Sequence, residues 1–160
     1  MAANAVRFVL LMLVSLLVGT MVGIWAGFDP ASLSSSAYVE QQQIAIRAFN
    51  VLLPAVGAGC ILLALLLAYM STGDPRSRYL LVSAAALLVV AGLVTRFGNQ
   101  PINAVVATWS AQAPPANWAQ LRDDWWQWHV VRSLAGVCAL ALLVLAVLGA
   151  KCTIGSGRVV

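Results

Sequence analysis

The sequence predicts an all-α protein, a bundle of four transmembrane helices that forms one integral membrane domain over residues 1–160. Of its 160 residues, 62% are hydrophobic and only 9% are charged, whereas soluble domains are about half apolar and a quarter charged. A chain of this size could not bury so much apolar surface in a core of its own. The apolar residues form continuous runs and do not alternate with polar ones, which excludes a membrane β-barrel.

The first two helices are separated by a turn-rich segment. We expect the first helix over about residues 7–28, where a long uncharged run follows Arg7. This run exceeds the roughly 7–15 residues of a signal-peptide core, so we expect it to remain as a span. Gly19 and Gly23 give it a small-residue face on which another helix can pack. The second helix is expected over about residues 38–71, beginning before its apolar run.

The third and fourth helices are separated by a Pro–Pro pair, which ends any helix before it. We expect the third helix over about residues 78–109, after the basic turn Thr72–Arg76. The fourth is expected over about residues 117–151, with Asn117 as its N-cap.

The basic residues favour one orientation in the membrane. In a four-span chain the amino terminus, the turn at Thr72–Arg76 and the carboxyl-terminal Lys151 and Arg158 lie on one side. Lysines and arginines in short loops are typical of the cytoplasmic side. We therefore expect both termini in the cytoplasm, in a plasma or inner membrane. The net charge of +4 is spread over both ends of the helices and forms no stripe that would bind nucleic acid.

Six polar residues interrupt the last three helices at one depth, about 27–36 Å from their cytoplasmic ends at 1.5 Å per residue. They are Arg47, Asn50, Arg96, Asn99, His129 and Arg132. Residues spaced by three or four positions extend these six into one stripe along each helix. The stripe of the second helix is Gln43, Arg47, Asn50 and Pro54, and that of the third is Gly92, Arg96, Asn99 and Asn103. The stripe of the fourth helix is Trp118, Arg122, Trp125, His129, Arg132 and Gly136. Charged groups at membrane depth tend to face a bundle interior, so we expect the stripes to line one cavity. Pro101 is expected to perturb the third helix there.

Each of these side chains also has an ordinary structural interpretation. An arginine near a helix end often extends its head group to the lipid surface. Tryptophans often form a belt at the membrane interface, which is the interpretation we favour for Trp126 and Trp128. Three arginines, three asparagines and one histidine on converging stripes nevertheless favour a shared cavity. His129 is the one side chain there that exchanges protons near neutral pH.

The sequence disfavours several kinds of chemistry. One histidine cannot supply a non-haem iron triad, which needs two histidines and a carboxylate, so no metal site is expected. A haem bound by His129 alone has no other support in the sequence. No phosphate-binding loop or nucleophile elbow is present in the sequence.

A combined motif, Asn-x-Pro-x-Asn followed by Arg-x-x-Trp-x-x-x-His-x-x-Arg, runs through the third and fourth helices. Its residues, with the tryptophans between and the similar segment of the second helix, are Asn99, Pro101, Asn103, Trp109, Trp118, Arg122, Trp125, His129, Arg132, Arg47-Ala48-Phe49-Asn50 and Pro54. In these residues the chain resembles the anthrone oxygenase-like family of small four-helix membrane proteins. The resemblance implies an activity like that of fungal members, which oxidise anthrones to anthraquinones with molecular oxygen and no cofactor.

The polar residues suit this chemistry. We predict that His129 is the general base that removes a substrate proton, and that Arg132 and Arg96 stabilise the resulting oxyanion. The predicted substrate-binding residues are Arg47, Asn50, Asn99, Asn103, Trp109, Arg122 and Trp125. Their amides would orient hydroxyl or carbonyl groups, and their tryptophans would stack on a flat ring. The expected partners are membrane lipid, molecular oxygen and an apolar aromatic molecule of the anthrone or quinol type.

Two other functions fit the same sequence. The polar layer of a non-catalytic membrane subunit or binding module would hold a lipid head group or a partner. With either function, a homo-oligomer or a larger membrane complex is a further possible partner. A transporter fits less well, because a pore needs polar groups through its full depth. Segments such as Ile61–Leu67 and Leu140–Leu148 carry none.

Overall fold

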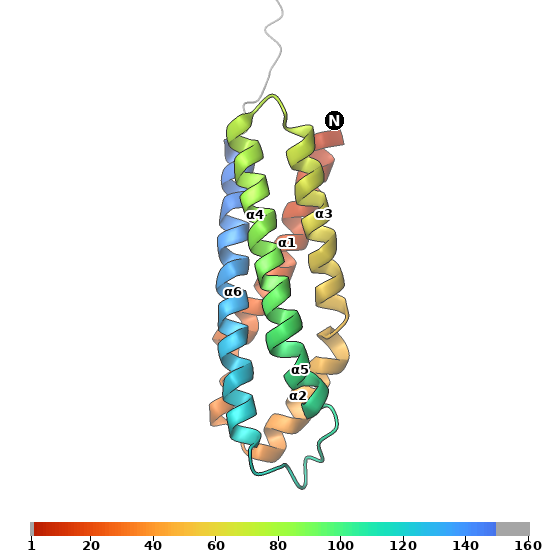
Figure 1. Ribbon diagram of the computed structural model, residues 1–160, viewed down its shortest axis with the longest axis vertical. Helices are drawn as coiled ribbons and strands as arrows, with labels where there is room; N and C mark the ends of the chain where they lie inside the picture. The colour runs from red at the N-terminus through yellow and green to blue at the C-terminus, as the bar shows by residue number, and fades with distance from the viewer. Residues whose placement is uncertain (1, 150–160) are drawn as a thin grey trace, which may run out of the picture.

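The computed structural model describes residues 2–149 and is entirely helical in its regular structure there. Four helical stretches are long and apolar enough to cross a membrane. They are built on the long helices α1 (Ala2–Gly27), α3 (Leu52–Met70), α4 (Pro75–Val94) and α6 (Trp118–Leu148). The shorter elements are η1 (Pro30–Ser32), α2 (Ser35–Phe49), η2 (Thr95–Asn99) and α5 (Gln100–Val106). The predicted all-α bundle with four membrane spans is confirmed (Figure 1).

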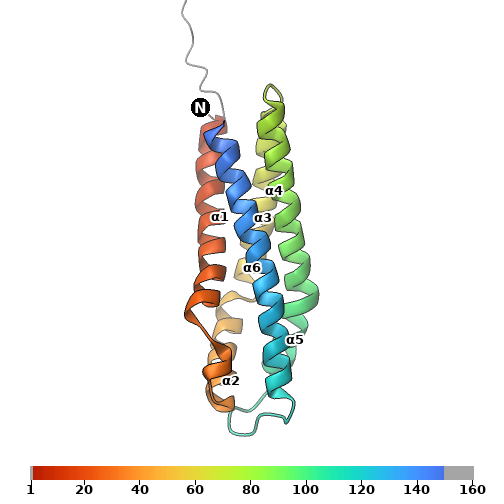
Figure 2. The same cartoon turned by 90° about the vertical axis from the view of Figure 1, so that its left-hand side faces the viewer.

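The ends of the bundle follow the predicted topology. The start of α1, the α3–α4 turn and the carboxyl end of α6 lie at one end, while α2, α5 and the loop before α6 lie at the other (Figure 2). An even number of spans therefore puts the two ends of the described chain on one side, and the cytoplasmic assignment of that side stays a prediction. The predicted end of the last helix at Lys151, and Arg158, lie outside the described residues.

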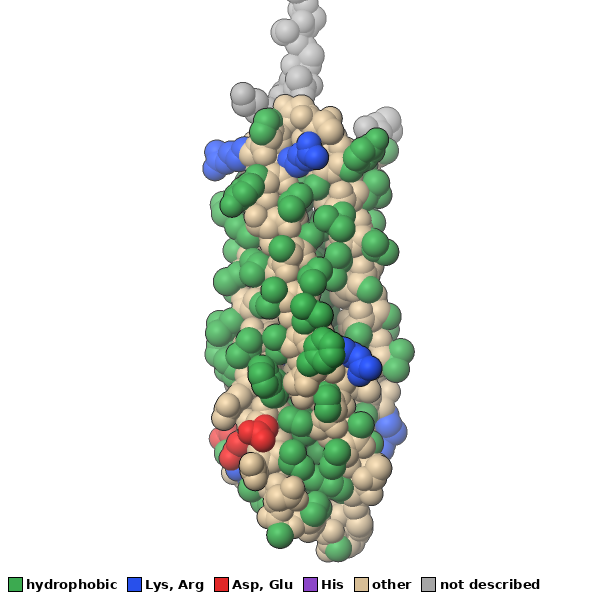
Figure 3. Space-filling view, viewed as in Figure 1, with side chains coloured by type: hydrophobic (Ala, Val, Ile, Leu, Met, Phe, Trp, Pro, Cys, Tyr) green, Lys and Arg blue, Asp and Glu red, His purple; other side chains and the backbone are tan. Residues whose placement is uncertain are grey.

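Apolar side chains hold the half of the bundle nearest the amino terminus together. Its buried residues come from all four long helices and include Leu10, Val14, Cys60, Ala64, Leu67, Leu81, Ala84, Leu88, Ala139 and Leu143. The alanines let the helix backbones approach closely, which matters in lipid because burial of apolar surface gives no driving force between helices there. Many large hydrophobic side chains are exposed on the long helices, and the face shown in Figure 3 is largely hydrophobic, as expected of a membrane protein.

The predicted helix over residues 38–71 is two helices, because the chain turns at Asn50 and Val51 between α2 and α3. Pro54 explains the break. A proline has no N–H to donate to the carbonyl four residues earlier, which here is that of Asn50. The Gln100 side chain donates to this free carbonyl instead, at 3.3 Å. Pro54 therefore leaves the backbone carbonyl of Asn50 without its helical partner, and a side chain of α5 donates a hydrogen bond to it.

The predicted helix over residues 78–109 continues without a gap but contains the π-helical turn η2. The N–H of Gln100 bonds to the carbonyl of Thr95, five residues earlier, and Pro101 follows without a donor of its own. The perturbation expected at Pro101 thus takes the form of one wider turn. Such turns add a residue to the helix face and often occur at functional sites.

The small-residue face predicted on the first helix is not used within the described part of the chain. Gly19 and Gly23 are both exposed. A Cβ atom built at either position would have no neighbour within 4 Å. The contacts of α1 with α3 and α6 use other sides of the helix.

Tyr38 anchors α2 without using its hydroxyl group. Its side chain is fully buried, with its ring 6.0 Å from that of Trp118, and its hydroxyl has no partner within residues 2–149. Burial raises the pKa of Tyr38 from 10.0 to about 12. Because the pKa of Tyr38 is higher in the folded protein than in the unfolded chain, the protein loses stability as the pH rises from 10.0 to about 12.

We expect Tyr38→Phe to leave the stability at neutral pH unchanged or slightly higher, because it removes a buried group without a partner. The variant should also lose less stability above pH 10 than the wild type does. Thermal unfolding in detergent at pH 7 and at alkaline pH tests both points. A clearly lower unfolding temperature at pH 7 would show that the hydroxyl has a stabilising partner.

Candidate functional site

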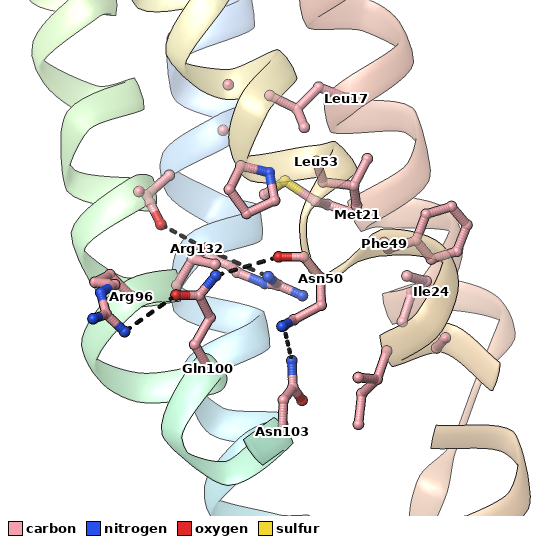
Figure 4. Close-up of a pocket in the computed structure, with 18 of the residues that line it drawn as sticks. Leu17, Met21, Ile24, Phe49, Asn50, Leu53, Arg96, Gln100, Asn103 and Arg132 are labelled. Atoms are coloured by element: carbon pink, nitrogen blue, oxygen red, sulfur yellow. Dashed lines mark hydrogen bonds between the residues drawn. The ribbon is translucent and has the colours of Figure 1, made fainter. Parts of the chain in front are cut away.

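A cavity of about 640 Å³ lies inside the bundle, where α2 meets α3 and where η2 follows α4 (Figure 4). Its size is typical of small-molecule sites. Most of its wall is apolar and includes Leu17, Met21, Ile24, Phe49, Leu53, Ile61 and Leu88. Its polar side chains are those of Gln41, Gln42, Asn50, Thr95, Arg96, Gln100, Asn103 and Arg132.

The cavity opens sideways through the wall of the bundle. Pro54 and Ala58 of α3, Gly92 of α4 and Arg96 of η2 border it and are themselves exposed. Figure 3 shows the bundle from the same direction as Figure 1, and most side chains on that face are hydrophobic. An apolar ligand can therefore reach the cavity from lipid.

Arg132 brings a positive charge into this apolar wall. It projects from α6, is partly buried, and has its guanidinium 5.8 Å from the centre of the Trp125 ring. One Nη atom lies 3.4 Å from the hydroxyl oxygen of Thr95. No carboxylate pairs with it, since the one ion pair within residues 2–149 joins Arg122 to Asp123 at 2.8 Å. A partly buried cation without a counter-charge is costly, so this wall favours a ligand that carries a negatively charged oxygen.

His129 lies behind Arg132 and is fully buried. Its Nε2 atom is 3.0 Å from the Met21 carbonyl oxygen of α1, and because a carbonyl only accepts, Nε2 carries the proton. Nδ1 then accepts from Nε of Arg132 at 3.1 Å and from an Nη atom at 2.8 Å. The imidazole also stacks on Trp125, at 5.0 Å between centroids and 7° between planes. Both ring nitrogens are therefore occupied, and the ring holds the guanidinium in place.

Four amide side chains form the opposite polar wall. Gln42 donates to Asn103 at 3.2 Å, and Asn103 donates to the side chain of Asn50 at 2.9 Å. Gln100 donates to the Asn50 carbonyl and accepts from Arg96 at 3.5 Å. These contacts join α2, α5 and η2 around the point where α2 ends.

The structure brings five of the predicted site residues together. Arg132, Arg96, Asn50, Asn103 and Trp125 all line the cavity. They come from four different elements, namely α6, η2, the α2–α3 turn and α5. The predicted convergence of three stripes into one pocket therefore occurs for these residues.

Five other predicted residues do not line the cavity. His129 is fully buried behind Arg132 and Trp125 of the cavity wall. Asn99 is also fully buried, with its amide donating to the Trp125 carbonyl at 3.0 Å. Arg122 pairs with Asp123 and lies over the Trp118 ring at 4.9 Å. Trp109 packs against the buried cluster of Ile102, Val106 and Trp125 and is not itself in the cavity wall. Arg47 is exposed on α2.

Two local departures from the straight α-helix bear on two of these differences, those at Arg47 and Asn99. The break before Pro54 means that Arg47 and Asn50 do not share one helical face with the residues of α3. The wider turn at η2 brings Gln100 onto the cavity wall and leaves Asn99 facing α6. Sequence reasoning missed Gln42, Thr95 and Gln100. Pro101 is the signal that would have pointed to Thr95 and Gln100, and the sequence carries no such signal for Gln42.

Most of the residues that line the cavity lie in a segment of the chain that is similar to a known protein family. A family model described as Anthrone oxygenase matches residues 43–142, which is more than half of the chain and extends from α2 into α6. No curated protein and no solved structure matches the chain at a significant level. Within the described residues, no group of three or more histidine, cysteine, aspartate or glutamate side chains is arranged to hold a metal ion. On the match to the family model, the chain belongs to the anthrone oxygenase family.

Proposed function

We propose that this protein oxidises an apolar aromatic substrate of the anthrone or quinol type with molecular oxygen, without a cofactor, inside the cavity. The observation that carries the proposal is the guanidinium of Arg132, which lies in a mostly apolar wall without a carboxylate partner within residues 2–149. Such a group is suited to bind an oxyanion that forms during the reaction. The lateral opening toward lipid suits an apolar substrate.

For an anthrone, the reaction converts the methylene carbon between two rings into a carbonyl. Transfer of one methylene proton to water gives an enolate, whose charge lies mainly on the existing oxygen. The carbanion carbon of the enolate bonds to dioxygen, and a proton completes a hydroperoxide. Loss of the second methylene proton, with cleavage of the O–O bond, leaves a quinone and one water. The substrate is thus the reductant, and one atom of each dioxygen enters the product.

In this proposal Arg132 binds the enolate oxygen and so favours loss of the first proton. Asn50 donates a second hydrogen bond from the opposite wall, and the Trp125 ring forms part of the wall against which the substrate packs. His129 is a positioning residue, because its free lone pair is directed at Arg132 and not at the cavity. The general-base role predicted for it would require a free ring nitrogen at the cavity wall.

Oxygen uptake tests the proposal. The purified protein in lipid nanodiscs should consume one dioxygen per anthrone oxidised, faster than empty nanodiscs do. With ¹⁸O₂, one labelled atom should appear in the new carbonyl and the other in water. A rate equal to that of empty nanodiscs, with both an anthrone and a quinol, would rule the activity out.

A pair of variants at His129 separates positioning from base catalysis. An asparagine carbonyl can take the place of Nδ1 as acceptor for Arg132 but cannot serve as a base near neutral pH. We therefore expect His129→Asn to retain about tenfold more kcat/KM than His129→Ala. If both variants fold, as judged by thermal unfolding, and are equally inactive, the histidine acts as a base.

The competing function is binding of an anionic lipid head group by Arg132 and Arg96, which also line the cavity. Phospholipid that copurifies with the wild type and is lost from Arg132→Gln, together with no oxygen uptake, would favour it. Oxygen uptake that depends on Arg132 would favour the oxygenase.

A further inference from the structure

The amide side chains of the cavity form a chain of hydrogen bonds with one direction. Gln42 donates to Oδ1 of Asn103, and Nδ2 of Asn103 donates to Oδ1 of Asn50. The side-chain oxygens of Asn103 and Asn50 are thereby occupied. The free end of the chain is Nδ2 of Asn50, which can only donate and takes part in none of the hydrogen bonds of this chain of amides.

This chain is firmly held at both ends. Gln42 is only 2% exposed, on α2. At the other end, Gln100 donates to the Asn50 carbonyl that Pro54 leaves free. The position of the Asn50 backbone and the direction of its side-chain amide are thus set by different partners.

Arg132 likewise presents only donors to the cavity. Two of its nitrogens donate to His129 and a third to Thr95, whose own hydroxyl donates to the Ala91 carbonyl at 2.8 Å. Figure 4 shows Arg132 and Asn50 extending toward the same part of the cavity from opposite sides. A ligand oxygen between them would meet N–H groups from both.

We propose that Gln42, acting through Asn103, is a specificity-determining positioning residue that fixes the Asn50 amide as a donor beside Arg132. The site therefore selects aromatic ligands that present an acceptor-only oxygen here, such as a phenolate, an enolate or a quinone carbonyl. Ligands that present an amino group at this point are rejected, because N–H would face N–H. The inference rests on the proposed function in taking this cavity as the substrate site.

The test is a comparison of two ligands of one shape. We would measure binding of 2-hydroxyanthraquinone and 2-aminoanthraquinone to the full-length protein in nanodiscs, from their visible absorption. The wild type should bind the hydroxy compound, as its phenolate, at least about tenfold more tightly than the amino compound. The absorption band of the bound phenolate should appear at a lower pH than in empty nanodiscs.

Two variants should remove this preference. Gln42→Leu breaks the chain at its buried start, and Asn50→Leu removes its last donor. Each should bring the affinity ratio of the two ligands to within about threefold of one, and the double variant should lower it no further, because both act on one chain. Gln120→Leu, at an exposed position outside the cavity, is the matched control and should keep the wild-type ratio.

The affinity ratio of the two ligands distinguishes a specific role of Gln42 from a general loosening of the fold, because loosening would weaken the binding of both ligands alike. The inference is overturned if Gln42→Leu keeps the wild-type ratio, or if the wild type binds the two ligands equally or binds neither. Oxygen uptake with an anthrone on the same samples separates the two proposals. An unchanged ratio with normal uptake contradicts this inference alone, whereas selective binding without uptake contradicts the proposed reaction alone.

Discussion

Arg132→Gln is expected to lower kcat/KM for anthrone oxidation by roughly 10²–10³-fold, the loss typical when an oxyanion donor is removed. The substitution keeps a side chain that can donate hydrogen bonds but removes the positive charge that faces the cavity. Because the guanidinium has no carboxylate partner within residues 2–149, its removal also ends the cost of burying it. We therefore expect the unfolding temperature to be unchanged or higher.

Two further measurements make this prediction specific. Activity of Arg132→Gln should recover in part at alkaline pH, where solvent hydroxide forms the enolate without help from the protein. Arg132→Lys should be intermediate, because one ammonium group cannot donate to His129 and to a ligand with the geometry of a guanidinium. Arg78→Gln, at an exposed position near the start of α4, is the matched control. A rate for Arg132→Gln within threefold of the wild type would remove Arg132 from the reaction.

Gly98→Ala is expected to destabilise the protein by about 1–3 kcal/mol, the usual cost of overpacking. A Cβ atom at residue 98 would lie 2.6 Å from Cγ of Trp128 on α6. This atom is at the root of the indole side chain, so the ring cannot yield without a change of rotamer or a shift of α6. A shift would also move Arg132, one turn further along the same helix, and oxygenase activity should fall with stability.

A double variant tests the cause of this effect. Trp128 is 44% exposed, so its removal opens space beside residue 98 without emptying the core. We expect Gly98→Ala combined with Trp128→Ala to be more stable than the sum of the single effects predicts. Gly19→Ala is the matched control, since a Cβ atom there would meet nothing within 4 Å. Thermal unfolding in detergent gives all four values, and strictly additive effects would contradict the proposed clash.

The membrane architecture could be predicted from the sequence because it depends on local properties. Whether a segment spans a bilayer depends on the length and composition of one continuous run. The third and fourth predicted spans begin within a few residues of their expected starts, at Pro75 and Trp118. The first and second predicted helices differ more. The first helix begins at Ala2, and the second predicted helix is divided into α2 and α3.

The site could be predicted only in part, because helical periodicity holds only while the helix is regular. A residue added or lost rotates every later side chain by about 100° around the axis, as 3.6 residues per turn requires. The stripe through α6 is unbroken, and it correctly places Trp125 and Arg132 in the cavity wall. Arg122 and His129 of the same stripe do not line the cavity, because Arg122 pairs with Asp123 and His129 is turned toward the Met21 carbonyl of α1. The stripes that cross the break at Asn50 and the wider turn at η2 misplace Arg47 and Asn99.

By itself, the sequence determined that four helices are long and apolar enough to cross a membrane, and it predicted that polar groups of three of them lie at one depth. Only the tertiary structure decided the chemistry of those groups, because each depends on a partner far away in the chain. His129 is 108 residues from the Met21 carbonyl that sets its tautomer, and Gln42 is 61 residues from Asn103. No pattern of spacing within one helix records which group of another helix it will meet, because that is decided by how the helices pack.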